Sequence, residues 1–171
     1  MQNDLVRTPD SAGSGDLLDL AGAMRSLADR AAEEDGRPAL EGLVRLATDR
    51  VAGARWASLT VRRGRRFTTE AATDDVAARA DQLQYDLGSG PGLDAVCSDP
   101  VAVTGDVVAD ERWPEWGQRV NAELGVTSVL SQRLTLLEDE SGAVAGLNIY
   151  SDLPEAFDEK SRGMGLVLST H

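Results

Sequence analysis

Hydrophobic and polar residues alternate through several short stretches of the chain, the first of which is residues 55–62. A second alternating stretch, residues 65–71, follows directly after Gly64. A period of two places alternate side chains on opposite faces of a strand, and a glycine between two such stretches favours a tight turn. The pattern therefore predicts an antiparallel hairpin. Its first strand has an aliphatic face of Ala57, Leu59 and Val61, and a mixed face of Trp56, Ser58 and Thr60.

The same alternation returns in residues 127–137 and 143–151, which are joined by the acidic link 138–142. This pattern predicts a second hairpin, and residues 100–103 predict a further short strand. The aliphatic faces of the second hairpin carry Leu130, Leu134 and Leu136, and Ala145, Leu147 and Ile149. The opposite faces carry Ser131, Arg133 and Thr135, and Gly146, Asn148 and Tyr150.

Apolar residues at spacings of three and four predict helices around these strands. The expected helices begin at Asp16, follow Pro38, cover residues 74–87, 91–97 and 112–124, and begin again near Phe157. Because the clear strands come as hairpins, we expect an α+β fold with a largely antiparallel central sheet and the terminal helices on one face.

The two faces of the predicted sheet differ in chemistry. One face is aliphatic, whereas the other mixes indole, hydroxyl, amide and guanidinium groups, which is typical of the wall of a ligand pocket. A partly covered outer face would give the same alternation. The candidate ligand-binding residues are Trp56, Ser58, Thr60, Ser131, Arg133, Asn148 and Tyr150, with Trp113 and Trp116 as a lid.

Arg133 and the two tryptophans each allow two interpretations. Inside a polar cavity Arg133 would hold a carboxylate or a phosphate, and on the rim of the sheet it would point into solvent. Trp113 and Trp116 would cover a ligand or would pack a loop against the core.

The first helix has apolar residues at spacings of three and four, which is the spacing of a coiled-coil seam. The seam consists of Leu17, Leu20, Met24, Leu27 and Ala31. A helix that faces the core would show the same stripe. We expect a partner helix, and hence a homodimer formed through the N- and C-terminal helices.

Length and charge narrow the class of protein. A chain of 171 residues favours one domain, and a net charge of −12 argues against direct binding of nucleic acid. The arginines around Gly64 have the composition of a solvated turn. The chain shows neither an apolar run that could span a bilayer nor a charged and apolar leader, so we expect a cytoplasmic protein without membrane contact.

The residues needed for catalysis and metal binding are scarce. The sequence has one cysteine, Cys97, and one histidine, His171, so it offers no metal site and no internal disulfide. A thiol cycle needs a resolving partner, and we expect Cys97 to be a small buried residue. The glycines of 88–92 lack the spacing of a dinucleotide fingerprint. We therefore expect a protein that is not an enzyme.

Several stretches resemble a known family. TSVLSQRLTLL (127–137), GAVAGLNIYSD (142–152) and the helix after AFDE (156–159) resemble a GAF domain. LQYDLGSGPGLDAV (83–96) and ERWPEWGQRVNAELGVTSVLS (111–131) resemble, more narrowly, GAF domains of actinobacterial proteins that carry a C-terminal ANTAR domain. The resemblance covers residues 16–171, leaves 1–15 as an expected disordered segment, and indicates that the ANTAR domain is absent or truncated.

The resemblance implies a signal-sensing, dimerising regulatory module of a bacterial signalling or RNA-binding antitermination protein, with a small molecule as its ligand. The alternatives are a ligand-free dimerisation domain and, third, a thiol-dependent reductase. Family signatures for specific cofactors are missing, so no cofactor is named. Gly92 stands where related sequences often have Cys, Cys97 precedes Ser98 rather than a bilin-type His, and Phe157-Asp158-Glu159 lacks the cyclic-nucleotide spacing.

Overall fold

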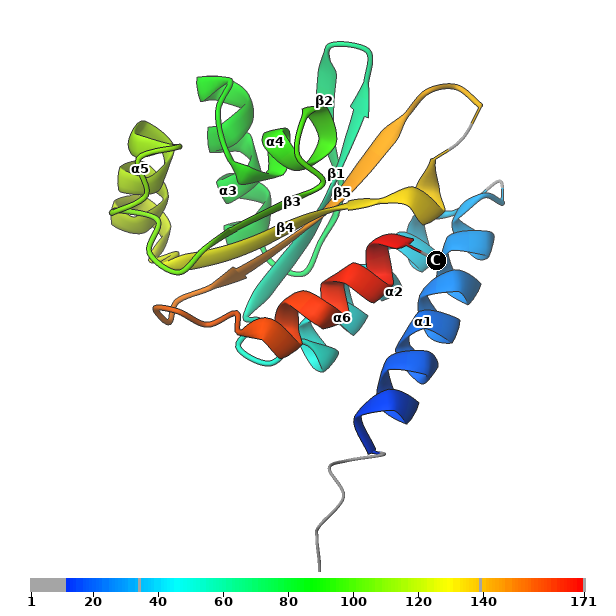
Figure 1. The fold of residues 1–171 in the computed structure, drawn as a ribbon. Coiled ribbons are helices and arrows are strands. Elements are labelled where there is room, and N and C mark those ends of the chain that lie inside the picture. The colour runs from blue at the N-terminus through cyan, green and yellow to red at the C-terminus, as the bar shows by residue number, and fades with distance from the viewer. Residues whose placement is uncertain (1–11, 34, 139, 171) are drawn as a thin grey trace, which may run out of the picture.

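The computed structural model describes residues 12–33, 35–138 and 140–170. Five strands form one antiparallel sheet in the order β2-β1-β5-β4-β3 (Figure 1). The strands are β1 (Trp56–Arg63), β2 (Arg66–Ala72), β3 (Val101–Thr104), β4 (Ser128–Leu134) and β5 (Val144–Ser151). Both predicted hairpins are present, β1 with β2 and β4 with β5. The α+β class and the antiparallel sheet are thereby confirmed.

Helices lie on both faces of this sheet (Figure 1). The aliphatic face packs against α1 (Ala12–Ala31), α2 (Arg37–Arg50) and α6 (Glu159–Thr170). The opposite face is covered by α3 (Asp75–Leu87), α4 (Pro91–Cys97) and α5 (Pro114–Leu124). The terminal helices therefore share one face, as the sequence predicts.

The core under the terminal helices is aliphatic. Leu43 and Val44 of α2 meet Leu59, Leu147 and Leu130 of the three central strands, and all five are almost completely buried. Burial of one such side chain contributes roughly 1.5–3 kcal/mol. This cluster accounts for the alternation that defines the strands.

Helix ends follow local chemistry. Asp74 precedes α3 and accepts a hydrogen bond from the Val76 amide, which satisfies one free N–H of the first turn. Gly88 ends α3 in the left-handed region at φ 63°, where a residue with a Cβ would be strained. Pro91 occupies the first turn of α4, as predicted.

The bounds of several elements differ from those expected, by one or two residues in most cases and by more in two. The first helix begins at Ala12 rather than Asp16, and residues 1–11 lie outside the described residues. β4 ends at Leu134, because the chain closes into a short 3-10 turn, η1 (Thr135–Leu137). The last helix begins at Glu159, where Asp158 accepts a hydrogen bond from the Ser161 amide.

The expectation that Cys97 is buried is wrong. Cys97 is exposed, because it is the last residue of α4 and the buried stripe of that helix consists of Leu93, Ala95 and Val96. The side chains of Leu17, Leu20 and Met24 in the predicted seam lie outside the described residues, as does that of Leu136. Among the described residues, no helix is long and apolar enough to cross a bilayer.

Candidate functional site

Hydroxyl and amide side chains meet in the interior beneath α3 and α4. Ser58 of β1 and Ser131 of β4 are both in register with Asn148, which lies on the strand between them. Ser131 donates from its hydroxyl to Asn148 Oδ1 at 2.8 Å, and Asn148 Nδ2 donates to Thr60 Oγ1 at 2.9 Å. Antiparallel pairing thus places side chains from three strands in one group.

A fully buried carboxyl group from α3 completes this group. Asp81 Oδ1 accepts hydrogen bonds from Ser58 Oγ at 2.9 Å, Asn148 Nδ2 at 3.1 Å and the Tyr150 hydroxyl at 2.5 Å. Its Oδ2 accepts from Thr69 Oγ1 at 2.8 Å. Four donors therefore surround one carboxyl group. We refer to the polar cluster as Ser58, Thr60, Thr69, Asp81, Gln84, Tyr85, Ser131, Asn148 and Tyr150.

Burial raises the pKa of Asp81 to about 6, although its hydrogen bonds to Tyr150 and Ser58 act in the opposite direction. Removal of a carboxylate from water disfavours its charged form, and neutral donors compensate only in part. Among the described residues, no cation forms an ion pair with Asp81. The carboxyl group can therefore gain or lose a proton close to neutral pH.

Tyr85 extends the polar cluster towards the β1–β2 hairpin. Its hydroxyl lies 2.8 Å from Thr60 Oγ1 and 2.9 Å from Thr69 Oγ1. Its ring stacks on Phe67 with centroids 6.0 Å apart. Burial, and next the charge of Asp81, raise the pKa of the Tyr85 phenol, so this group stays protonated and can donate.

Gln84 connects the polar cluster to the start of α4. Its Nε2 donates to the Tyr150 hydroxyl at 2.9 Å. Its Oε1 accepts from the amides of Gly92 at 2.8 Å and Leu93 at 3.3 Å. Because first-turn amides have no partner within their own helix, Gln84 serves α4 as a cap that comes from another helix.

Gly92 allows α4 to lie directly on Asn148. A Cβ at this position would be 2.6 Å from Asn148 Oδ1, closer than real Cβ atoms come to a neighbouring atom. The backbone of α4 and the amide of Asn148 are therefore in contact. A Cys at position 92, as the resembled sequences often have, would require Asn148 to move.

The structure brings together five of the nine predicted site residues. These five are Ser58, Thr60, Ser131, Asn148 and Tyr150, each buried to within about 1%. Their polar groups bond to one another and to α3. The sequence pattern thus identified the strand half of the polar cluster, while its binding role stays a prediction.

The other four predicted residues lie around this group. Trp113 donates from Nε1 to Asp94 Oδ2, and Trp116 donates from Nε1 to the Ala80 carbonyl. Both rings are buried, which favours the packing interpretation. Arg133 Nε donates to the Ala95 carbonyl at 3.0 Å, and Trp56 lies beneath the guanidinium of Arg55.

The alternating strand pattern does not include the residues that α3 contributes to the polar cluster. Asp81, Gln84 and Tyr85 lie three and four residues apart, so they share one face of α3. Ala77 and Ala80 are fully buried on the same helix. Polar residues at the buried spacing of an amphipathic helix were the signal that could have identified them.

The arrangement is suited to hydrogen bonding and to holding a proton. Among the described residues, no group of histidine, cysteine and carboxylate side chains could hold a metal ion. Cys97, the one thiol of the chain, is on the surface at the far end of α4. A ligand that entered the polar cluster would have to replace hydrogen bonds that the side chains now make to each other.

No family model and no curated protein matches the sequence. Solved structures do match. A protein of Burkholderia vietnamiensis described as a GAF sensor has a TM-score of 0.64 at 17% identity, covering 94% of this chain and 96% of its own. The GAF domain of a phosphoenolpyruvate-protein phosphotransferase from Coxiella burnetii has a TM-score of 0.61 at 14% identity, covering 91% and 90%.

An enzyme shares the same fold. Free methionine-R-sulfoxide reductase from Neisseria meningitidis, solved with its substrate, has a TM-score of 0.61 at 15% identity, covering 96% of this chain and 93% of its own. At such identities the likeness establishes the fold alone. The chain therefore has a GAF-like fold, and its function must be argued from its own residues.

Proposed function

We propose that this chain is a sensory and dimerising GAF module of a bacterial regulator, and that the polar cluster is where it takes up a small molecule. The observation that carries the proposal is the fully buried, fourfold hydrogen-bonded Asp81. A packed hydrophobic group of similar volume is often at least as stabilising as a buried charged one. A titrating group kept in the interior is therefore a candidate functional site.

Entry of a ligand requires α4 to move away from the sheet. The turn before α4 contains Gly88 at φ 63° and Gly90 at φ 159°, on either side of Ser89. Gln84 and Asn148 contact the first turn of α4, so their hydrogen bonds would be exchanged for bonds to the ligand. For an acidic ligand, Arg133 is the nearby cation, and its Nε now bonds to α4.

Native mass spectrometry of the purified protein tests this proposal. We expect a retained small molecule in the wild type that is lost in Asn148→Ala and kept in Gln82→Ala, a change on the exposed side of α3. For an acidic ligand, Arg133→Ala should abolish the ligand-induced thermal stabilisation. The absence of any retained mass from freshly purified wild type would favour the ligand-free dimerisation domain.

The terminal helices are the proposed surface for a second subunit. α1 and α6 lie side by side on the aliphatic face (Figure 1). Leu18 on α1 is 74% exposed and Leu166 on α6 is 54% exposed. Exposed leucines on neighbouring helices favour a helical bundle with a partner, because association would remove them from water.

Light scattering of the full chain measures this association directly. We expect a dimer for the wild type and a monomer for Leu18→Glu and Leu166→Glu. Leu153→Glu is the matched control, since Leu153 is 57% exposed but lies in the loop after β5. A wild-type monomer, or equal effects of all three changes on the oligomeric state, would contradict the proposal that the terminal helices form the dimer interface.

The regulator is proposed to act in RNA-binding antitermination through a separate output domain. The resembled stretches 83–96 and 111–131 support this assignment, and in the structure they span the end of α3, most of α4, all of α5 and the start of β4. With a net charge of −12, the sensory chain itself should not bind nucleic acid. Fluorescence anisotropy with an RNA hairpin in 150 mM salt should show no saturable binding. Saturable binding would contradict the expectation that the sensory chain itself does not bind nucleic acid.

A thiol-dependent reductase is the second candidate, because the fold occurs in such enzymes and Cys97 is exposed. We propose that the chain is not an enzyme, since one cysteine leaves no resolving thiol. Turnover of free methionine sulfoxide with dithiothreitol should be equal, and at background, for the wild type and Cys97→Ser. Turnover that depends on Cys97 would reverse this assignment.

A further inference from the structure

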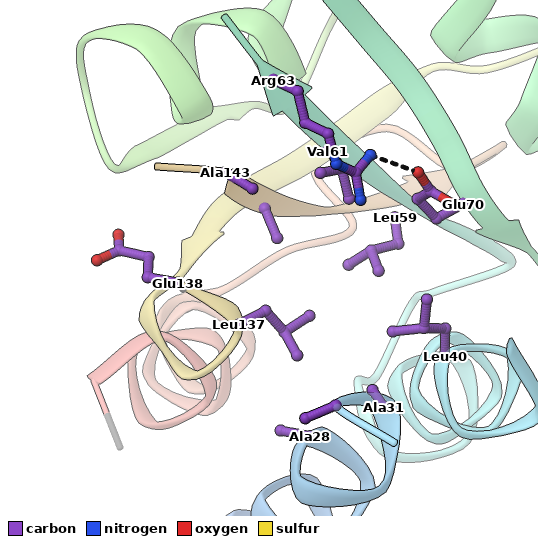
Figure 2. A pocket seen from close by; sticks show the side chains of 12 residues that line it. Ala28, Ala31, Leu40, Leu59, Val61, Arg63, Glu70, Leu137, Glu138 and Ala143 are labelled. Atoms are coloured by element: carbon purple, nitrogen blue, oxygen red, sulfur yellow. Dashed lines mark hydrogen bonds and ion pairs between the residues drawn. The ribbon is translucent and has the colours of Figure 1, made fainter. Parts of the chain in front are cut away.

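A hollow of about 220 Å³ lies on the aliphatic face of the sheet, between α1, α2 and strands β1 and β5. Figure 2 shows its lining side chains, with Leu59 and Val61 as the floor and Ala28, Ala31 and Leu40 as the helical wall. Small side chains leave the space open, because α1 presents alanines where larger residues would fill it. The hollow is on the opposite side of the sheet from the polar cluster.

The interior of this hollow is suited to an aliphatic occupant. Nine of its twelve lining residues are alanine, leucine or valine, and the other three are charged. Its floor offers neither aromatic rings for stacking nor hydrogen-bonding side chains, so a nucleotide or a sugar would lose its bonds to water without replacement. An engineered apolar cavity of about 150 Å³ already binds benzene, so this hollow has room for a short alkyl chain.

Three charged side chains lie at the rim, Arg63, Glu70 and Glu138. Glu138 is exposed and its carboxylate points away from the hollow (Figure 2), so Arg63 and Glu70 are the donor and the acceptor that face a ligand. Arg63 Nη1 donates to Glu70 Oε1 at 2.8 Å, and both side chains reach solvent (Figure 2). The hydrogen bond from Arg63 lowers the pKa of Glu70, so the pair is ionised at neutral pH. A carboxylate on the ligand would meet Glu70, and an ammonium would meet Arg63. An uncharged amide can donate a hydrogen bond to Glu70 through its N–H and accept one from Arg63 through its carbonyl oxygen.

We propose that this hollow binds an uncharged aliphatic amide, with an alkyl chain of about six carbons on the apolar floor and the amide at the Arg63–Glu70 pair. This site goes beyond the proposed function and does not depend on it, because it uses none of the residues of the polar cluster. A ligand here would contact Ala28 and Ala31, and so would press on α1.

Titration of the full-length protein, followed by amide NMR shifts, tests the site with hexanamide, hexanoate and hexylamine as probes. We expect hexanamide to saturate at the lowest concentration and to shift residues of α1 and β1. Ala28→Leu should fill the hollow and abolish binding, whereas Ala122→Leu on the exposed side of α5 should not. Saturation that is unchanged in Ala28→Leu would place the ligand elsewhere and overturn the proposal.

Changes at the rim test the role of the charge pair. Glu70→Gln should shift the preference towards hexanoate and Arg63→Gln towards hexylamine, each by roughly tenfold, the scale of one charge-assisted hydrogen bond. If the relative affinities for hexanamide, hexanoate and hexylamine were the same in the wild type and both variants, the assignment of the amide would be overturned. Binding seen only in Leu18→Glu would mean that a second copy covers the hollow, and would overturn the proposal as a whole.

Discussion

At the scale of single residues, Asp81 makes stability depend on pH in an unusual direction. Its pKa is about 6 in the folded protein and has the ordinary carboxyl value of 3.8 when the chain unfolds. The folded state therefore binds the proton more tightly, and stability is gained as pH falls through 6. Between pH 7 and pH 5 the free energy of unfolding should rise by about 1 kcal/mol from this group.

Urea denaturation of the wild type and Asp81→Asn at both pH values measures this gain. The variant cannot titrate at position 81, so the difference between the two proteins isolates the carboxyl group from the general loss of negative charge. We expect the wild type to gain about 1 kcal/mol more than the variant. An equal gain in both proteins would mean that Asp81 is already protonated at pH 7 or stays ionised at pH 5.

Gly92 and Asn148 should behave as one unit. Gly92→Ala places a Cβ against Asn148 Oδ1, and we expect a loss of roughly 1–3 kcal/mol in the free energy of unfolding, as is usual for overpacking. Asn148→Ser removes the clash, so Gly92→Ala should cost much less in that background. A double-mutant cycle by chemical denaturation measures the coupling. Additive losses would show that the backbone of α4 moves instead of the amide.

Alternation could identify Ser58, Thr60, Ser131, Asn148 and Tyr150 because a period of two is a property of the strand itself. Asp81 could not be identified in the same way. Its helix carries polar residues on several sides, as in Asp81-Gln82-Leu83-Gln84-Tyr85, so helical spacing is a weaker signal here than alternation is in a strand. The packing of α3 on the sheet decides which of these sides is buried. The exposure of Cys97 could not be predicted either, because it depends on α4 ending at that residue.

At the scale of elements, α4 depends on α3 for its start. α4 has seven residues, and a helix of this length has little stability of its own. Gln84→Leu would leave the buried amides of Gly92 and Leu93 without their acceptor, at a cost of roughly 1–3 kcal/mol each. We expect faster hydrogen exchange at both amides, measured by NMR. Gln82→Leu, an exposed change on the same helix, should leave their exchange rates unaltered.

Local signals explain why the order of elements could be predicted. A glycine with a left-handed φ, as at Gly88, or a proline in a first turn, as at Pro91, ends or begins a helix whatever the rest of the chain does. The order of strands in the sheet, in contrast, depends on contacts between residues far apart in the sequence. The pairing of β1 with β5 joins residues about ninety positions apart, as in Ser58 with Asn148, and no local signal specifies it.

At the scale of the whole molecule, the sheet separates two interiors. One side holds the polar cluster beside a second apolar core that contains Trp113 and Trp116. The other side holds an aliphatic core and an apolar hollow beneath the terminal helices. β4 contributes to both, because Ser131 points into the polar cluster and Gln132 contacts the backbone of α6. A ligand in the polar cluster that displaced β4 would therefore also displace α6. This helix belongs to the surface that we propose for dimerisation.

The net charge of −12 should make the protein more stable in salt. Compaction brings like charges together, and screening relieves their repulsion, whereas exposed ion pairs such as Arg119–Glu123 contribute little and lose little. Raising NaCl from 20 mM to 500 mM should increase the free energy of unfolding by about 1 kcal/mol. Urea denaturation at pH 7 measures the change, and KCl at equal ionic strength should give the same value, because screening does not depend on the cation. A decrease with salt would mean that local ion pairs outweigh the repulsion of the whole surface.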